Sequence, residues 1–319
     1  MRRNRGHTYR EQLQRSAEGR TLARFLAEGY GHSSPADWIG RIRRGLVRLD
    51  GAVAVPETRL RAGQWLSWDR PGWVEPDAPL VFAVLYEDED VLAVAKPSGL
   101  PTLPGGGFLE HTLLSQLRRY RDGLHPLHRL GRHTSGIVLC AATRRARSTL
   151  SSDWSHGRVR KTYRALASGT PATPVFEIST PIGPIPYTPL GTLNAACPDG
   201  KPATSTVRAL QHLDGEFLCD VEIRTGRPHQ IRIHLAAAGH PLAGDPLYGP
   251  GGVPRPDCRA LPGDGGYELH AAELRFPHPM KRDEVTVRCA PPPRLRTNLS
   301  RRTESGIPPD PRLRDLPWG

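Results

Sequence analysis

The amino-acid sequence predicts an α+β fold built on a mixed, mostly antiparallel sheet. Three observations support this prediction. From residue 80 onward, short apolar runs recur between turn-forming residues, and runs of that length are typical of strands. Two longer stretches, 111–121 and 143–157, favour helices. Strands dominate and the helices are inserted among them, as in α+β domains. The expected strands include 81–86, 91–95, 137–141, 163–167 and 217–223.

A smaller unit is expected before this sheet. We predict a flexible basic arm over residues 1–20 and a small domain over 21–75. The small domain begins with a helix, and Ser34 with Pro35 forms a good N-cap and first-turn pair for a second one. Asp50-Gly51 lies between two apolar runs and is a strong hairpin signal. A further strand is expected at 63–68.

The larger domain is expected over residues 80–290. A linker rich in proline, glycine and acidic residues precedes it. The segment 291–319 is proline-rich and charged, so we expect it to be mostly disordered. A chain of 319 residues with 37% hydrophobic content is long enough to form one large domain and a small one.

The cysteines and the apolar runs indicate the cellular compartment. Five cysteines are scattered without a CxxC pair, so neither a disulfide framework nor a zinc knuckle is indicated. The longest apolar stretch, 81–86, is too short to span a bilayer, and the basic first residues lead into no apolar signal region. We therefore expect a cytoplasmic protein that does not contact a membrane. We also expect the protein to be a monomer.

The charge of the chain favours an anionic partner. Lys and Arg number 44 against 32 Asp and Glu, which gives a net charge of +12. Almost all of the positive charge is arginine, whose planar guanidinium binds phosphate and stacks on bases. A GC-rich genome would produce the same arginine bias, so charge alone does not decide. The second helix of the small domain places Arg41 and Arg44 opposite its apolar side, where we expect them to contact RNA phosphates.

Four segments of the larger domain combine polar, glycine and charged residues with adjoining apolar runs. The histidines of these segments lack the spacing of a helical zinc pair, so no metal is expected. Ser135 fits a backbone cap better than a nucleophile. What remains is a cationic pocket with one aromatic residue, which suits a flipped-out nucleotide. The segments are KPSGLPT at 96–102, HRLGRHTSG at 128–136, KTYRAL at 161–166 and RTGRPHQIRIHL at 224–235.

In this order the four segments resemble those of the RluA family of RNA pseudouridine synthases, over nearly all of residues 80–280. The stretches TGRPHQIRIHL and LHAAELRFPHP, the second at 269–279, are the most specific. The stretch RIRRGLVRLDGAVAVPETRLRAGQWL resembles the αL-type RNA-binding module named after ribosomal protein S-four. The resemblance implies the pseudouridine synthase fold with a basic cleft, and conversion of uridine to pseudouridine in ribosomal or transfer RNA. It implies no cofactor and no DNA partner.

The resemblance also assigns roles to individual residues. Arg129 matches the arginine that fills the gap left by the flipped base. Tyr163 matches the tyrosine that contacts the base and serves as general base at carbon 5, and Arg232 matches the basic residue that pairs with the catalytic aspartate. Taken alone, Arg227 and Arg232 would be assigned to the solvated face of a strand. Further substrate contacts are expected from His128, Thr134, Arg227, His229 and Gln230.

One position departs from the family's pattern. The family reads His-Arg-Leu-Asp in the second segment, and that aspartate attacks the ribose or removes a proton from it. This chain has Gly131, which has no side chain for either step. A carboxylate such as Asp122 or Asp245 could reach the pocket instead, or the reaction could proceed through Arg232, Tyr163 and substrate groups. The third alternative is a protein that only binds RNA; of the three, we favour an enzyme. Gly131 also suits a turn with positive φ.

Overall fold

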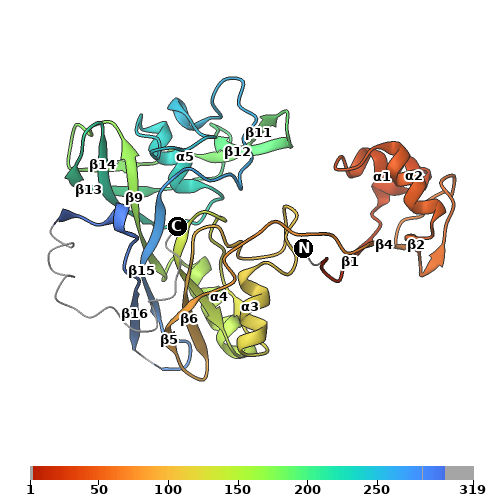
Figure 1. Ribbon diagram of the computed structural model, residues 1–319, viewed down its shortest axis with the longest axis horizontal. Helices are drawn as coiled ribbons and strands as arrows, with labels where there is room; N and C mark the ends of the chain where they lie inside the picture. Colours follow the sequence, from red (N-terminus) through yellow and green to blue (C-terminus); the bar gives the residue numbers. More distant parts are fainter. Residues whose placement is uncertain (1–2, 282, 299–319) are drawn as a thin grey trace. The chain divides into compact units, whose positions relative to one another are not determined.

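The computed structural model describes residues 3–281 and 283–298 of the chain (Figure 1). The chain forms two compact units, Met1–Glu75 and Pro76–Gly319, and each is considered by itself below. The residues expected to form an arm (1–20) fall within the first unit, and those between the two expected domains (76–79) fall within the second.

The N-terminal unit packs two short helices on a four-stranded antiparallel sheet. Ser34 starts the second helix with a capping box, because its side chain accepts the backbone N–H of Asp37 while Asp37 accepts that of Ser34. The buried core of the unit includes Trp38 and Trp68. The helices are α1 (Leu22–Gly29) and α2 (Pro35–Arg43), and the strands lie in the order β1 (His7–Gln12), β4 (Trp65–Arg70), β2 (Val47–Leu49) and β3 (Ala52–Val53).

The prediction of a flexible arm over residues 1–20 is wrong for most of its length. Strand β1 pairs with β4 along all six of its residues, and a 3-10 turn at Arg15–Ala17 follows it. The physical reason is that Leu13 and Ala17 are buried in the core of the unit, and β1 provides hydrogen-bond partners for β4. Met1 and Arg2 lie outside the described residues.

The larger unit is built on a mostly antiparallel sheet, which confirms the α+β prediction. Its strands follow the order β10-β13-β14-β9-β15-β8-β6-β5, with β16 beside β15 and β7 beside β8. Only the β8–β15 pair is parallel among the described strand pairs of this sheet. The bounds are β5 (Ala83–Glu87), β6 (Val91–Lys96), β7 (His125–Pro126), β8 (Ser135–Ala141), β9 (Arg160–Ser168), β10 (Val175–Ile178), β13 (Ser205–His212), β14 (Glu216–Ile223), β15 (Leu269–Pro277) and β16 (Glu284–Arg288).

Three helices accompany this sheet. Helices α3 (Leu113–Tyr120) and α4 (Arg144–Ser155) confirm the predicted helices, and Thr112 and Thr143 cap their first turns. Helix α5 (Gln230–Ala237) contains Arg232, so this residue lies on a buried helix and not on the solvated face of a strand. Figure 1 shows α3 and α4 beside the β5–β6 end of the sheet, and α5 beside the small hairpin of β11 (Ile182–Tyr187) and β12 (Gly191–Ala196). Strands β9 and β15 lie between these two groups.

The C-terminal end is ordered further than the sequence predicts. A 3-10 turn at Pro293–Leu295 places Leu295, which is fully buried, in a small apolar cluster with Leu166, Leu218 and Ala243. Burial of this leucine explains why the predicted disorder does not begin at residue 291. Residues 299–319 of that prediction lie outside the described residues.

Candidate active site

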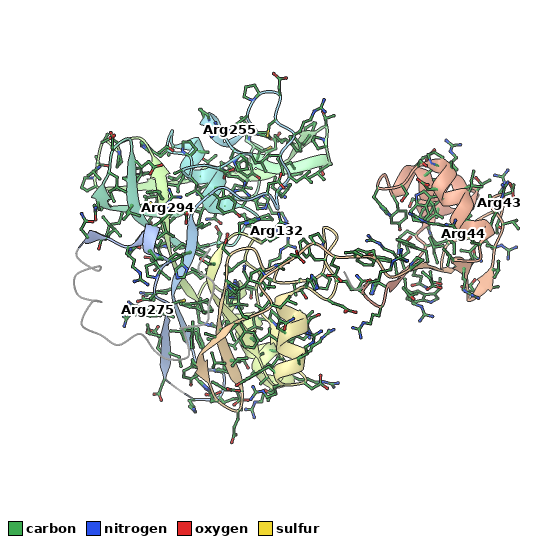
Figure 2. The ribbon with its side chains drawn as sticks, in the orientation of Figure 1. Arg43, Arg44, Arg132, Arg255, Arg275 and Arg294 are labelled. Carbon is green, nitrogen blue, oxygen red and sulfur yellow. The ribbon has the colours of Figure 1, made fainter. Side chains whose placement is uncertain are left out.

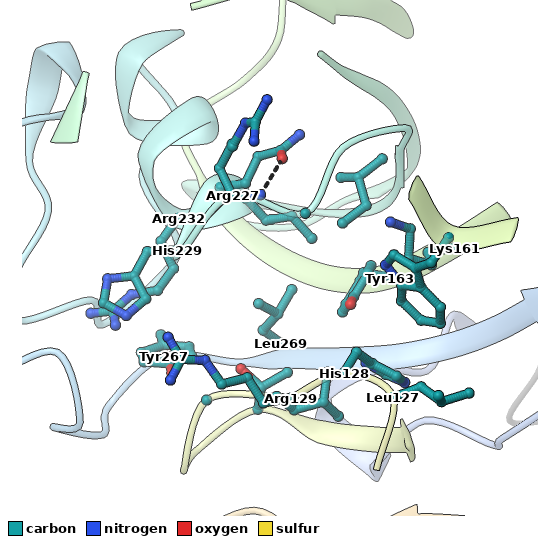
Figure 3. A pocket seen from close by; sticks show the side chains of 18 residues that line it. Leu127, His128, Arg129, Lys161, Tyr163, Arg227, His229, Arg232, Tyr267 and Leu269 are labelled. Atoms are coloured by element: carbon teal, nitrogen blue, oxygen red, sulfur yellow. Dashed lines mark hydrogen bonds between the residues drawn. The ribbon is translucent and has the colours of Figure 1, made fainter. Parts of the chain in front are cut away.

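A pocket of about 340 Å³ lies over the centre of the larger sheet (Figure 3). It is lined by β9, by the start of β15, by the loop that leads into β8 and by the segment that leads into α5. Four of its lining side chains are cationic, and none of those described is a carboxylate. The lining residues are Leu127, His128, Arg129, Leu130, Gly131, Thr134, Trp154, Lys161, Tyr163, Ile223, Gly226, Arg227, His229, Gln230, Ile231, Arg232, Tyr267 and Leu269.

The first of the four segments holds the second in place. Lys96 is fully buried, and its Nζ donates to the carbonyl oxygens of Pro97 at 2.8 Å, Leu100 at 2.7 Å and Arg132 at 3.1 Å. Three carbonyl acceptors match the three N–H donors of an ammonium group. Thr102 adds hydrogen bonds to both backbone groups of Leu130. The segment 96–102 is therefore the support of the loop that carries residue 131.

A glycine brings that loop against β15. Gly136 has φ +104°, and a Cβ there would lie 2.3 Å from the carbonyl oxygen of Ala271. Only glycine fits this close approach, which allows the short parallel pairing of Ser135 and Gly136 with His270 and Ala271. The loop at 128–134 consequently reaches the pocket from the β15 side.

Gly131 lies at the pocket wall in an ordinary backbone conformation. Its φ is outside the left-handed region, which excludes the alternative of a positive φ, and backbone strain does not explain the glycine. Its carbonyl accepts the N–H of Thr134 at 3.1 Å, which closes a turn. A Cβ at residue 131 would lie 3.2 Å from Oη of Tyr267 and 3.4 Å from Oγ1 of Thr134. A side chain at residue 131 would thus be tight against the tyrosine hydroxyl, which would have to shift by a few tenths of an ångström.

Arg232 is paired with a carboxylate from its own unit. Its Nε and Nη2 donate to the two carboxylate oxygens of Asp245 at 2.7 and 2.8 Å, and its Nη1 donates to the carbonyl of Pro262 at 3.0 Å. Both side chains are about 2% exposed. Burial opposes the charge, yet the hydrogen bonds that Arg232 donates to Asp245 raise the pKa of Arg232 above its usual value.

The proposed replacement carboxylates are not in the pocket. Asp245 does not line it, and besides binding Arg232 it accepts the backbone N–H groups of Leu247 and Tyr248. Asp122 is exposed after α3 and does not line the pocket either. The interpretation that Asp122 or Asp245 replaces the carboxylate missing at Gly131 is therefore not supported by this geometry.

Tyr163 and Lys161 project from β9 into the pocket. Tyr163 is 8% exposed, and burial raises its pKa to about 12, so the hydroxyl is protonated at neutral pH. Lys161 donates to the carbonyl of Thr225 at 3.2 Å and lies 5.1 Å from the ring centre of Trp154. Burial lowers the pKa of Lys161 to about 8, which leaves most of it charged at pH 7.

Two of the predicted RNA contacts serve the scaffold. Nε2 of His128 accepts the backbone N–H of Leu139 at 3.0 Å, and burial together with Lys161 lowers the pKa of His128 to about 3. Gln230 is buried, donates to Thr204 and Ser205 and accepts the N–H of Arg227. Both side chains line the pocket, although Nε2 of His128 and the amide of Gln230 are bonded to the protein.

His229 begins helix α5 in the left-handed region, with φ +56°. The Tyr248 hydroxyl donates to the carbonyl of Asn194 at 2.7 Å, so Nδ1 of His229 is the donor in its 2.8 Å contact with the Tyr248 oxygen. Burial lowers the pKa of His229 to about 4. The ring is therefore neutral, and its Nε2 lone pair can accept a proton or a hydrogen bond.

The remaining predicted contacts fall into two groups. Arg129 is exposed at the pocket, has no hydrogen bond or ion pair within the described residues, and remains available to a ligand. Arg227 lines the pocket but donates to the carbonyl of Pro202, and Thr134 is buried beside Gly131.

The small unit holds the two other predicted contacts. Arg41 donates to Ser33 and lies 4.7 Å and 5.3 Å from the ring centres of Trp38 and Trp68, so it also serves packing. Arg43 and Arg44 are exposed (Figure 2).

Two further features concern metals and membranes. In residues 3–281 and 283–298, no group of three or more His, Cys, Asp or Glu side chains is arranged to hold a metal ion. No helix in the same ranges is long and apolar enough to cross a membrane.

Comparisons with known proteins identify the family to which this chain is similar. The family model for RNA pseudouridylate synthase matches residues 90–237. An uncharacterised RNA pseudouridine synthase of Synechocystis sp. is 46% identical over 276 residues, which cover 86% of this chain and 94% of that protein. RNA pseudouridine synthase 5 of Arabidopsis thaliana is 40% identical, with 92% of this chain and 95% of that protein covered.

The chain belongs to the RNA pseudouridylate synthase family.

More distant relatives agree with this membership. Ribosomal large subunit pseudouridine synthase D of Vibrio parahaemolyticus is 30% identical, with 84% of this chain and 86% of that protein covered. Among solved structures, human RNA pseudouridylate synthase domain containing 1 has a TM-score of 0.55 and 26% identity, and the match covers 75% of this chain and all of that one. The fold predicted from the four segments is thereby confirmed.

In a pseudouridylate synthase, the pocket brings together the three residues that the resemblance marked as central. Arg129, Tyr163 and Arg232 all line it, together with Gly131 at the aspartate position. Sequence reasoning missed Trp154, Tyr267 and the role of Lys161. Lys161 belongs to the third segment, and Tyr267 precedes the closing LHAAELRFPHP stretch by two residues, so the motifs themselves pointed to both.

Proposed function

We propose that this protein isomerises a uridine of a ribosomal or transfer RNA to pseudouridine in the pocket over β9 and β15. The observation that carries the proposal is that Tyr163, Arg129 and Arg232 line one pocket in the positions that the family's pattern requires. The volume of about 340 Å³ is in the range of small-ligand pockets. The ring of Tyr163 offers a surface against which the flipped base stacks.

The charge of the pocket suits an RNA backbone. Arg129 and Lys161 are cationic, and no lining carboxylate opposes them within the described residues. Phosphates that flank the flipped nucleotide gain from this positive field, and Arg129 is free to enter the space that the base leaves in the RNA.

The N-terminal unit supports a second contact with RNA. Residues 1–75 contain 14 arginines, no lysine and eight acidic residues, so this quarter of the chain has a net charge of +6 out of +12. We propose that the unit is an αL-type module that binds the target RNA through phosphates, and that the protein works in the cytoplasm. The exposed pair Arg43 and Arg44 on α2 and its C-cap supports this proposal.

Release of hydrogen from carbon 5 tests the activity. RNA is isolated from cells that lack the protein and that have been grown with uridine tritiated at carbon 5. Isomerisation replaces the carbon 5 hydrogen by the bond to ribose, so an active protein transfers tritium to water. We expect release by wild type and a loss of roughly 100-fold or more for Tyr163→Phe, which keeps the ring and removes the hydroxyl. Tyr120→Phe removes an exposed hydroxyl on α3 and is the matched control.

The alternative function is RNA binding without catalysis, and it is favoured because no described residue that lines the pocket has a carboxylate. The same experiment separates the two functions. If the wild-type protein releases no tritium, and if the Tyr163→Phe variant binds this RNA with the same affinity as wild type, the protein is a binding module. A pseudouridine map that is the same in cells with and without the protein leads to the same conclusion.

A further inference from the structure

We infer that the hydroxyl oxygen of Tyr267 takes the place of the carboxylate missing at residue 131, and that it attacks C1′ of the target ribose. This inference rests on the proposed function and deepens it. Tyr267 lies just before β15, and its side chain lines the pocket together with Gly131 and Tyr163 (Figure 3).

The first support is that Gly131 and Tyr267 fit one another. A Cβ at residue 131 would lie 3.2 Å from Oη of Tyr267. An aspartate oxygen lies two bonds beyond Cβ, so an aspartate at 131 would have to share this space with the tyrosine hydroxyl or displace it. Residue 131 thus has no side chain, and a hydroxyl oxygen lies beside it. In this arrangement the oxygen comes from the residue just before β15 instead of from the loop.

The second support is that this hydroxyl is free for a substrate. Tyr267 is only 6% exposed, so its ring is fixed by packing. Within the residues that the structure describes, its Oη has no hydrogen-bond partner, and it is not enclosed away from the pocket. A nearly buried tyrosine whose hydroxyl serves the fold normally has a partner, as Tyr187 and Tyr248 do in this unit.

The third support is the charge around the ring. The guanidinium carbon of Arg232 lies 4.2 Å from the ring centre of Tyr267. The groups that face this tyrosine from α5 and the segment after it are Arg232, its partner Asp245 and the neutral Tyr248. The pocket adds Arg129, Lys161 and Arg227 and no lining carboxylate among the described residues. Because the cations exceed the anions, an oxyanion at this position is stabilised.

The chemistry balances without a further reactant. Tyr267 first gives its proton to water, and the phenolate oxygen bonds to C1′ as the bond from C1′ to N1 breaks and its electron pair leaves with the uracil. The uracil turns, and C5 attacks C1′ while the bond from C1′ to the tyrosine oxygen breaks. The C5 proton leaves through the Tyr163 oxygen to water, and N1 takes up a proton. Tyrosine is already known as a nucleophile in the hydrolysis of glycosidic bonds.

The deciding variant is Tyr267→Phe, which removes one oxygen and keeps the ring. On RNA from cells lacking the protein, tritiated at carbon 5 of uridine, we expect a single-turnover rate at least 100-fold below wild type, with RNA affinity within about twofold. Tyr120→Phe again controls for the loss of a hydroxyl. A rate for Tyr267→Phe within twofold of wild type would overturn the inference. If wild type itself releases no tritium, the proposed function fails as well, so the two failures are distinguishable.

The pH profile separates a nucleophile from a residue that only positions the substrate. In model peptides tyrosine ionises near about pH 10 and aspartic acid near about pH 4. If the attacking species is the phenolate, the wild-type single-turnover rate should therefore rise about tenfold per pH unit, or on the order of 100-fold from pH 7 to pH 9. A flat wild-type profile, with Tyr267→Phe still inactive, would assign Tyr267 a positioning role and overturn the attack on C1′.

A double variant moves the oxygen back to the loop. We expect Gly131→Asp alone to give no gain, because the carboxylate meets the hydroxyl of Tyr267. Combined with Tyr267→Ala, the aspartate has the space and faces Arg232. Activity of this double variant, at least tenfold above Tyr267→Ala and independent of pH from 7 to 9, would support the inference. Tyr163 is present both in wild type and in the double variant. A difference between the pH profiles of these two proteins is therefore due to residue 267 or 131.

Discussion

His270 is a single neutral side chain that makes the stability of the fold near the pocket depend on pH. It is fully buried on β15, where Nδ1 contacts the hydroxyl of Ser135 at 2.9 Å and Nε2 contacts the carbonyl of Cys289 at 3.1 Å. A carbonyl only accepts, so Nε2 carries the hydrogen and Nδ1 accepts from Ser135. Burial lowers the pKa of His270 to about 4, so protonation would leave a charge inside the sheet.

The sign of the resulting pH dependence follows from this lowered pKa. Between about pH 4 and 6.5 the unfolded chain binds a proton at this histidine that the folded chain does not. The free energy of unfolding should therefore fall as the pH falls from 6.5 towards 4. We expect His270→Asn to be less stable at pH 7.5 but to lose less stability on acidification. Urea unfolding at pH 7.5, 6 and 5 measures both effects. Equal pH slopes for His270→Asn and the exposed control His212→Asn would contradict this account.

At the scale of single residues, the sequence motifs located the pocket but not every role within it. Arg129, Tyr163 and Arg232 were assigned by their motif positions, and the structure brings them together. The role of Gln230 was misjudged, because its side chain bonds to Thr204 and to Ser205 at the start of β13, which are distant in the sequence. The closing LHAAELRFPHP stretch pointed to the neighbourhood of Tyr267, but only the fold shows that its hydroxyl lies beside Gly131.

At the scale of elements, α5 was the hardest to predict. The run Gln-Ile-Arg-Ile-His-Leu alternates apolar and polar residues, which is typical of a strand. In the structure it is a helix that is buried on all sides from Gln230 to Ala236, so it has no solvent-facing stripe to reveal the helical period. The buried polar side chains are bonded inside the fold, Arg232 to Asp245 and His234 to Ser205 and Thr180. Helices α3 and α4, by contrast, keep an exposed face and were predicted correctly.

The start of α5 provides a test of backbone strain. His229 precedes the helix with φ +56°, a conformation that costs an L-residue about 1–2 kcal/mol and glycine little. His229→Ala and His229→Gly both remove the imidazole, so the difference between them isolates the backbone. We expect the glycine variant to be more stable by about 1 kcal/mol, or roughly 2–4 °C in melting temperature. Thermal unfolding followed by circular dichroism measures it. An alanine variant that melts at or above the glycine variant would show that this conformation is not strained.

At the scale of the whole molecule, the charge is divided unevenly between the two units. The N-terminal unit has half of the net charge in fewer than a quarter of the residues. Its arginines differ in availability, because Arg41 packs on two tryptophans and binds Ser33, whereas Arg43 and Arg44 are exposed. The larger unit holds the pocket and its chemistry. We therefore expect RNA affinity and catalytic rate to respond to different variants.

Removal of Arg43 and Arg44 together tests this division in the full chain. Each phosphate that the protein no longer neutralises should reduce the slope of log affinity against log salt by about 0.7–0.9, so Arg43→Ala/Arg44→Ala should flatten it by roughly 1.5. Affinity at low salt should fall, while the single-turnover rate at saturating protein stays within about twofold of wild type. The control is Arg20→Ala/Arg24→Ala, which removes the same charge from guanidinium groups that already bind Glu28. Filter binding from 50 to 300 mM salt gives the slopes. If the two double variants had the same slope, the effect would be one of net charge, and the assignment of phosphate contacts to α2 and its C-cap would be wrong.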